Sequence, residues 1–187
     1  MQVRKRTTSR SLYGTLPLSN HLAPRLPMRA VADDLRHTLT LVLPHLQALD
    51  ADTRTHRPAP DRWTKQEILG HLIDSAANNH QKFVRMIAQQ HLDFPGYAQN
   101  HWVTAQRWNT ADWPAMLALW AAYNRHLADL IEHAAPEALA HTITIDGAGP
   151  FRLDFVMTDY VEHLKHHLKQ LLPDLPLDSS FENVYDA

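Results

Sequence analysis

Apolar residues recur at alternating spacings of three and four along residues 30–50. This period places them on one face of an α-helix, and Pro44 should bend that helix because proline removes a backbone donor. The apolar positions are Val31, Leu35, Leu39, Val42, Leu46 and Leu49. The pattern predicts a first amphipathic helix, followed by a polar connection over residues 50–62 that contains two prolines.

A second helix is predicted from Thr64 onward. Thr64 and Glu67 have the spacing of a capping box, in which each side chain satisfies a free backbone donor of the first turn. The apolar face that follows contains Ile68, Leu69, Leu72, Ile73, Ala76, Phe83 and Ile87. The opposite line is polar, and most of it is expected to face solvent: Glu67, His71, Asp74, Ser75, Asn78, Lys82 and Arg85.

The connection over residues 92–108 is 17 residues long and rich in aromatic side chains. Adjacent antiparallel helices are usually joined by much shorter links, so this length favours a crossover or a loop over a site. We expect the segment to pack over one end of a helical bundle. Tyr97 and Trp102 are candidates for the walls of a substrate pocket.

A third helix is predicted to begin within residues 110–114 and to continue to about residue 133. Asn124 lies within about 25° of the centre of its apolar face, at 100° per residue. A buried amide must find hydrogen-bond partners. Two interpretations are open: a core amide bonded to backbone or to a neighbouring helix, or a residue that lines a substrate pocket.

Residues 141–146 alternate and are β-branched, which predicts a short strand, and the glycines that follow predict a turn that could close a minor hairpin. A last helix is predicted over residues 153–172 and is stopped by Pro173. Four helices, one long connection and no repeats predict an all-α protein, a four-helix bundle formed by residues 30–173. Residues 174–187 are expected to be a loosely held tail.

Charge divides the chain unevenly. Residues 1–29 contain six basic and no acidic residues, while the remainder carries 12 basic against 20 acidic residues, a net charge of −8. We expect the basic segment to be a solvated, disordered tail; a true start at Met28 or a targeting role are the alternatives. With a net charge of −2 overall, no nucleic-acid partner is expected.

Two further classes are excluded or disfavoured by composition. The absence of cysteine excludes disulfides and thiolate-bound zinc. No segment resembles a signal peptide or membrane anchor, which favours a cytoplasmic protein without membrane association.

The chain has 14 histidines, and His163 and His167 form its H-x-x-x-H pair. Roughly one such pair is expected by chance at this histidine content, so the i,i+4 spacing alone is weak evidence. On a helical wheel His167 lies at the margin of the apolar stripe, with His163 about 40° further round. His166 falls on the polar side and is expected at the surface.

Two imidazoles make an incomplete metal site, because zinc with one open position takes three protein ligands. Without cysteine the third ligand must be His, Asp or Glu. Helix patterning does not choose between His71 and His80.

Three segments of the chain resemble one family when they are read together. These are WTKQEILGHLIDS at residues 63–75, LWAAYNRHL at 119–127 and DYVEHLKHH at 159–167. Their order and spacing resemble the DinB/YfiT-like superfamily over about residues 30–172.

The resemblance implies a four-helix bundle with a long crossover between the second and third helices. It also implies a divalent metal ion, such as zinc or nickel, held by His71, His163 and His167. The family's crossover usually carries acidic residues where this chain has Ala98, Asn100 and His101, so no carboxylate role is expected in that loop.

The superfamily includes thiol-dependent transferases and isomerases, predicted metal hydrolases and proteins of unknown activity. The resemblance therefore implies a metal-dependent enzyme of the thiol S-transferase type, which joins a low-molecular-weight thiol cosubstrate to a small electrophile. A metal-dependent hydrolase and a non-catalytic, stress-response metal-binding module are the alternatives. Asp74 and Glu67 are candidates for a general base or for orienting His71. Bundles of this family often dimerise, so a homodimer is expected.

Overall fold

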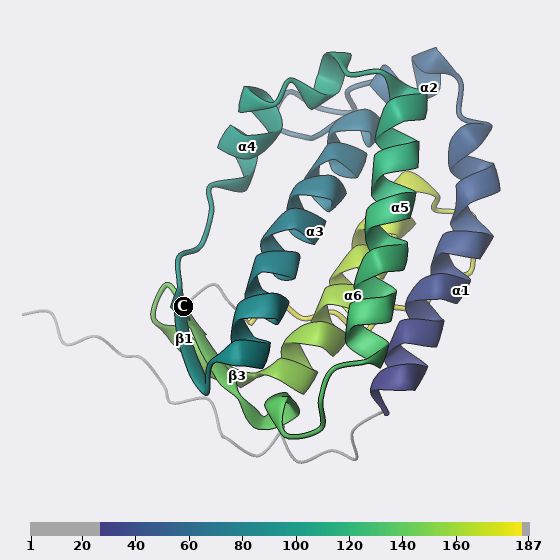
Figure 1. Ribbon diagram of the computed structural model, residues 1–187. Helices are drawn as coiled ribbons and strands as arrows, with labels where there is room; N and C mark the ends of the chain where they lie inside the picture. Colours follow the sequence, from purple (N-terminus) through teal and green to yellow (C-terminus); the bar gives the residue numbers. More distant parts are fainter. Residues whose placement is uncertain (1–26, 185–187) are drawn as a thin grey trace, which may run out of the picture.

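The computed structural model describes residues 27–184, and four long helices form its body (Figure 1). These helices are α1 (Met28–Gln47), α3 (Lys65–Ala88), α5 (Trp113–Glu132) and α6 (Leu153–Leu171). Shorter elements lie between them: helices α2 (Ala51–Thr55) and α4 (Gln99–Ala105), 3-10 turns η2 (Trp108–Thr110) and η3 (Ala138–Ala140), and strands β1 (His91–Phe94), β2 (Thr142–Ile145) and β3 (Ala148–Arg152). No helix within residues 27–184 combines the length and the apolar character needed to cross a membrane.

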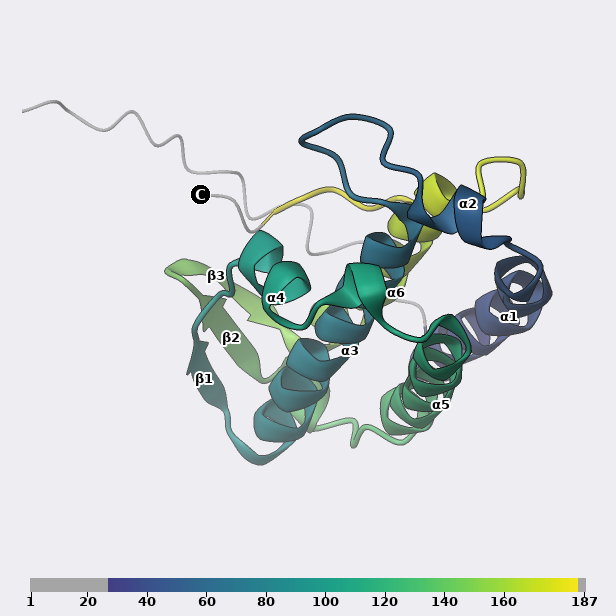
Figure 2. The ribbon, with the colours of Figure 1, turned by 90° about the horizontal axis from the view of Figure 1, so that it is seen from above.

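The four long helices pack as a bundle around one hydrophobic core. Helix α1 packs on α5 and α6, and α3 packs on the same two helices, as the view from above shows (Figure 2). Each helix turns its predicted apolar stripe inward, and Leu35, Leu69, Trp120 and Leu164 are fully buried. The helical bundle expected from the sequence is confirmed.

Local caps determine where two of these helices begin. At the start of α3 the Glu67 backbone N–H donates to Thr64 Oγ1 at 3.1 Å, and the Thr64 N–H donates to Glu67 Oε2 at 2.8 Å. This is the predicted capping box. Asp112 caps α5 by accepting a hydrogen bond from the Ala115 N–H at 3.0 Å. Both starts therefore follow from short-range signals.

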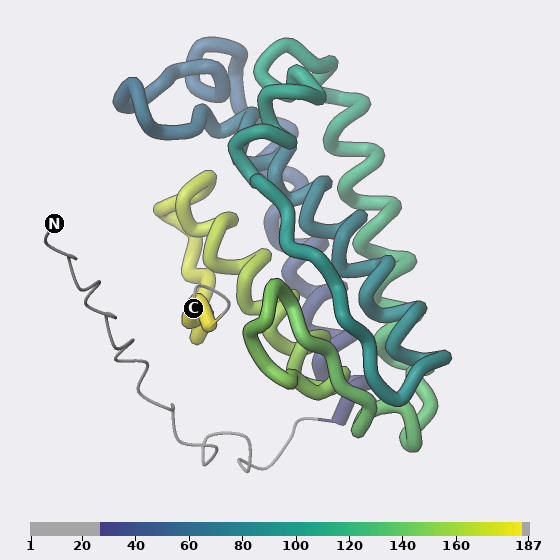
Figure 3. Tube along the Cα trace, turned by 90° about the vertical axis from the view of Figure 1, so that its left-hand side faces the viewer, coloured from purple at the N-terminus to yellow at the C-terminus, as the bar shows by residue number. Residues whose placement is uncertain are grey.

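The segment between α3 and α5, residues 89–112, runs along the side of α3 (Figures 1 and 3). It contains β1, α4 and η2, and all three contact α3. The expectation that it packs over one end of the bundle is corrected, because the segment follows α3 over most of its length. We call residues 89–112 the connecting segment.

A small mixed sheet corrects the purely α-helical expectation. Strands β2 and β3 form the predicted hairpin, and β1 pairs in parallel with β2 in the order β1-β2-β3. Strand β1 was not predicted, because its four residues are too few to show a periodic pattern. Its partner is distant in sequence, since His91 pairs with Thr142.

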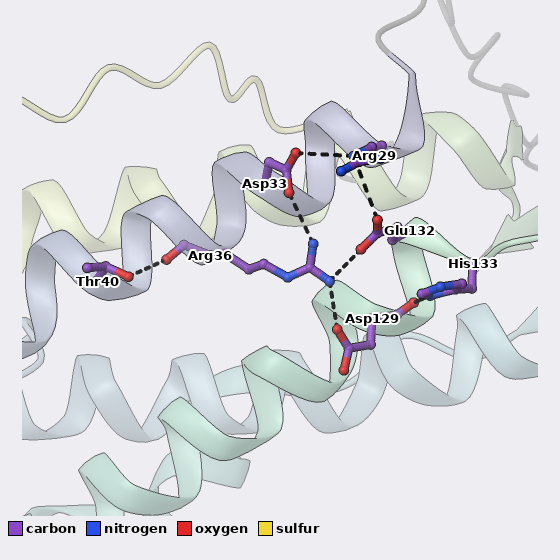
Figure 4. Close-up of polar contacts among 7 residues, drawn as sticks. All are labelled: Arg29, Asp33, Arg36, Thr40, Asp129, Glu132 and His133. Atoms are coloured by element: carbon purple, nitrogen blue, oxygen red, sulfur yellow. Dashed lines mark hydrogen bonds and ion pairs between the residues drawn. The ribbon is translucent and has the colours of Figure 1, made fainter.

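An ion-pair network joins α1 to α5 on the surface (Figure 4). The guanidinium of Arg36 lies 2.6 Å from Asp129, 2.7 Å from Glu132 and 3.1 Å from Asp33. The hydrogen bonds that Arg36 donates to Asp129 and Glu132 raise the pKa of Arg36 above its ordinary value. Arg29 is more loosely placed, 3.9 Å from both Asp33 and Glu132. The network reinforces the contact between α1 and α5.

The two ends of the chain differ from expectation where the structure describes them. Met28 and Arg29 already belong to α1, and residues 1–26 of the predicted basic segment lie outside the described residues. The expectation of a loose C-terminal tail is corrected for residues 174–184. Leu177 is buried, and Ser179 donates a hydrogen bond to the backbone of Glu162 at 2.8 Å.

Candidate metal centre

Three histidines from two helices converge inside the bundle. His71 comes from α3, and His163 and His167 come from successive turns of α6. Their candidate ligand atoms all lie within 4.8 Å of one another, and within residues 27–184 no other group of three His, Asp or Glu side chains does so. The structure thus brings together the three residues that the family resemblance implies.

The imidazole contacts have the dimensions of a metal site. Nε2 of His71 lies 3.4 Å from Nε2 of His163. Two nitrogens bound to one tetrahedral zinc ion at about 2.0–2.1 Å would lie about 3.3 Å apart. His71 and His167 also each have a buried Nδ1 without a hydrogen-bond partner among the described residues. Three imidazole donors of this kind fit a borderline divalent ion such as zinc or nickel.

Burial keeps these imidazoles neutral. It lowers the pKa of His71 to about 3 and that of His167 to about 4, with smaller contributions from His167 and His166 respectively. Burial also lowers the pKa of His163 well below its ordinary value, assisted by the two other histidines. A metal ligand must be unprotonated. The site therefore presents free lone pairs at neutral pH.

Side chains around the cluster hold its rings in place. The Trp63 ring lies 4.9 Å from that of His71, and Ser75 Oγ lies 3.5 Å from His163 Nδ1. His166 is exposed and lies 3.2 Å from Gln170 Nε2. The surface position that the helical wheel predicts for His166 is confirmed.

Most of the polar line of α3 is buried where it was expected to be solvated, although Arg85 is exposed. His71, Asp74 and Ser75 are each less than 4% exposed, and Glu67 and Asn78 are 8% exposed. The connecting segment and α6 cover this line. Helix periodicity identifies a polar face, but it does not reveal that another polar surface packs against it.

Asp74 ties the connecting segment to α3. The indole N–H of Trp108 donates to Asp74 Oδ2 at 3.1 Å, and the side-chain amide of Gln106 donates to Oδ1. Burial raises the pKa of Asp74, although both donors act against this. Trp108 also packs against Gly70, where an added Cβ would lie 2.2 Å from the indole Cγ. The contacts of Gln106 and Trp108 with Asp74 were not predicted from the sequence. The local signal for Trp108 was Gly70, which lies beside His71 and leaves room for the indole.

Glu67 belongs to the start of α3. Besides the capping box, its Oε1 accepts a hydrogen bond from Arg57 at 2.8 Å. Burial acts to raise the pKa of Glu67, but the Thr64 N–H and the Arg57 guanidinium lower it below its ordinary value. Neither Glu67 nor Asp74 contacts the free Nδ1 of His71. The predicted orientation of His71 by one of these carboxylates is not observed.

The three predicted pocket residues have different environments. Tyr97 is half-buried and makes an edge contact with Trp102 at 5.0 Å, and burial followed by the charge of Asp74 raises the pKa of Tyr97. Trp102 is exposed.

Asn124 is fully buried: its Nδ2 donates to the Trp120 backbone at 2.9 Å, and its Oδ1 accepts from the Tyr160 hydroxyl at 2.6 Å. With no accessible surface, Asn124 is a core amide, and its pocket-lining interpretation is corrected.

A cavity of about 760 Å³ adjoins the histidine cluster. His167 lines it, so the cluster faces space in which a small molecule fits. Other lining side chains come from the start of α3, from α4 and from the end of α6: Trp63, Lys65, Ile68, Asn100 and Gln170. A metal ion held by the three histidines would have this cavity on its His167 side.

Comparison with known proteins agrees with this fold. The structure is similar to that of YfiT from Bacillus subtilis, described as a probable metal-dependent hydrolase with an unusual four-helix bundle topology. The similarity has a TM-score of 0.72 at 17% identity and covers 78% of this chain and 84% of that one. No curated protein matches the sequence. The sequence model of the DinB superfamily matches residues 34–171, and the chain therefore belongs to the DinB superfamily.

Proposed function

We propose that this protein is a divalent-metal-dependent enzyme that activates a small nucleophile for attack on a small electrophilic substrate. The observation that carries the proposal is the cluster of the buried His71 with the half-buried His163 and His167, which is neutral and adjoins, at His167, a cavity of about 760 Å³. Three protein ligands with an open side are typical of catalytic zinc sites, whereas structural sites are closed by four ligands.

The roles of the chain's own residues follow from their positions. The three histidines would hold the metal ion, which would act as a Lewis acid and lower the pKa of a water or thiol nucleophile. Trp63 covers one side of His71 and also lines the cavity, so it excludes water and offers the substrate an apolar wall. Asp74 keeps the connecting segment on α3 through Trp108.

We further propose that the nucleophile is a low-molecular-weight thiol. Metal-dependent proteases, for example, use a glutamate as general base for the attacking water. The two candidate carboxylates are engaged elsewhere, Glu67 with Thr64 and Arg57, and Asp74 with the connecting segment. A thiol ionises much more readily than water and would not need such a base beside a bound metal ion. The hydrolase alternative is supported by the description of YfiT as a probable metal-dependent hydrolase.

Metal content tests the centre itself. In single alanine variants of His71, His163 and His167, we expect bound metal to be lost, measured by elemental analysis of the purified proteins. His166→Ala is the matched control, because His166 is on the same helix but exposed. Loss of metal from His166→Ala with retention in His167→Ala would contradict the assignment.

Turnover tests the reaction. The metal-loaded protein is incubated with a model electrophile, with and without each common cellular thiol, and both thioether formation and hydrolysis are followed. We expect thiol-dependent conjugation that His71→Ala abolishes. Hydrolysis without thiol would support the alternative, and metal binding without either reaction would identify a non-catalytic metal-binding module.

A further inference from the structure

A segment outside the family match lies against the metal centre. The superfamily model ends at residue 171, and residues 174–184 then pack back on α6, the helix that carries two of the three histidines. Leu175 and Leu177 attach the segment to the core. We call residues 174–184 the C-terminal strap.

Glu162 anchors the strap next to a ligand. Its Oε2 accepts hydrogen bonds from the Ser180 N–H at 2.6 Å and the Ser180 hydroxyl at 3.1 Å, and its backbone carbonyl accepts from Ser179 at 2.8 Å. Lys165 lies 2.5 Å from the same carboxyl group. Charge-assisted bonds of this kind are stronger than neutral ones. The strap is therefore fixed one residue before His163.

The anchor places an aromatic ring on that histidine. The Phe181 ring makes an edge contact with the His163 imidazole, with centroids 5.0 Å apart and planes at 72°. It also lies 5.4 Å from the ring of His166. Ser75 contacts the Nδ1 of His163 at 3.5 Å. The imidazole of His163 is thus restrained by α3 and by the strap.

We propose that Phe181 is a positioning residue of the metal centre, which holds the His163 imidazole in its ligating orientation and shields it from solvent. This inference rests on the metal centre of the proposed function. A ligand ring that is held before binding loses less rotational freedom when the metal binds, and dissociates less readily afterwards. Hydrocarbon beside the ligand also limits the access of water to the metal–nitrogen bond.

Cobalt release by the full chain tests the proposal independently of any activity. Wild type, Phe181→Ala, Phe181→Leu and Glu182→Ala are loaded with Co²⁺, and its transfer to excess chelator is followed by absorbance. Glu182 is the matched control, because it neighbours Phe181 in the strap but is exposed. We expect Phe181→Ala to release cobalt about 2- to 12-fold faster, the range for losing one aromatic contact. Phe181→Leu should show a smaller increase, and Glu182→Ala none.

The visible spectrum of bound cobalt gives a second measure, since it depends on ligand geometry. We expect it to change in Phe181→Ala and to match wild type in Glu182→Ala. Urea unfolding of each metal-free variant checks that the fold is retained, and Phe181→Leu keeps the test valid if the alanine variant unfolds.

The outcomes separate the inference from the proposed function. Wild-type release rates and spectra in both Phe181 variants would overturn the inference and leave the metal centre intact. Failure of the wild-type chain to bind cobalt or zinc would instead refute the metal centre, and with it both proposals.

Discussion

Acidification should destabilise the metal-free protein through its buried histidines. The ordinary pKa of an imidazole is 6.5, whereas burial in the folded chain lowers that of His71 to about 3 and that of His167 to about 4. Below pH 6.5 the unfolded state therefore binds protons that the folded state does not. The stability that these histidines contribute is complete above pH 6.5 and is lost as the pH falls toward the folded values.

The size of the effect follows from these values. At pH 5.0 the medium is about 1.5 pH units below the unfolded pKa, and each unit corresponds to about 1.4 kcal/mol. At pH 5.0 each of the two histidines should then lower the free energy of unfolding by about 2 kcal/mol, or about 4 kcal/mol together. His163 acts in the same direction, because burial lowers its pKa too. This is a large part of the 5–15 kcal/mol that typically separates folded from unfolded proteins.

Urea unfolding of the chelator-treated protein at pH 7.5 and pH 5.0 measures this loss, followed by circular dichroism. His71→Leu/His167→Leu is the comparison, since it removes two of the three titrating histidines and leaves His163. Glu67 and Glu162 contribute little in this interval, because their folded pKa values lie below the ordinary 4.5. The double variant should therefore lose less stability than wild type over the same interval, and what it still loses is expected to come mainly from His163.

A loss below about 1 kcal/mol in the metal-free wild type would refute the reasoning, because even one buried neutral histidine should exceed it. Equal losses in wild type and the double variant would also refute it, since the pH dependence would then arise elsewhere. Saturating zinc should reduce the loss at moderate acidity by favouring the neutral imidazoles.

Three substitutions and one control variant test the packing of the bundle. Arg36→Ala should lower the free energy of unfolding by about 1 kcal/mol at low salt and by less at high salt, whereas Arg29→Ala, with a side chain 78% exposed, should have no measurable effect in the same urea titrations. Gly70→Ala should lower the free energy of unfolding by about 1–3 kcal/mol, because its Cβ would lie 2.2 Å from the Trp108 indole. Tryptophan fluorescence should change as well, and a variant as stable as wild type would contradict the contact. Tyr160→Phe should cost about 1–3 kcal/mol in thermal or urea unfolding by leaving a buried amide oxygen without its donor at 2.6 Å, and an unchanged stability would argue against that bond.

Much of the helical framework is determined by the sequence alone. The alternation of apolar positions predicts all four long helices, and the Thr64–Glu67 pair predicts the start of α3. The exposure of His166 follows from the 100° rotation per helical residue. These features depend on residues within one or two turns of each other, so a short stretch of sequence contains the necessary information.

The third histidine could not be identified from the helical pattern. His71 and His80 both lie on α3, and patterning does not choose between them. Resemblance to the DinB superfamily selects His71. In the structure His71 is buried beside His163, whereas His80 contacts Tyr123 and His126 on the side toward α5. The choice depends on which helix packs against which face of α3.

Only the tertiary structure decides the surroundings of the centre. Most of the polar line of α3 is buried because α6 and the connecting segment cover it, and strand β1 exists because Thr142 and its neighbours lie beside it. Phe181 reaches His163 only after the chain turns back on α6. Periodicity shows which side of a helix is polar. What packs against that side is determined by contacts between residues far apart in the sequence. The i,i+4 spacing of His163 and His167 is close to chance, and these two residues form a candidate metal centre only because such contacts bring His71 beside them.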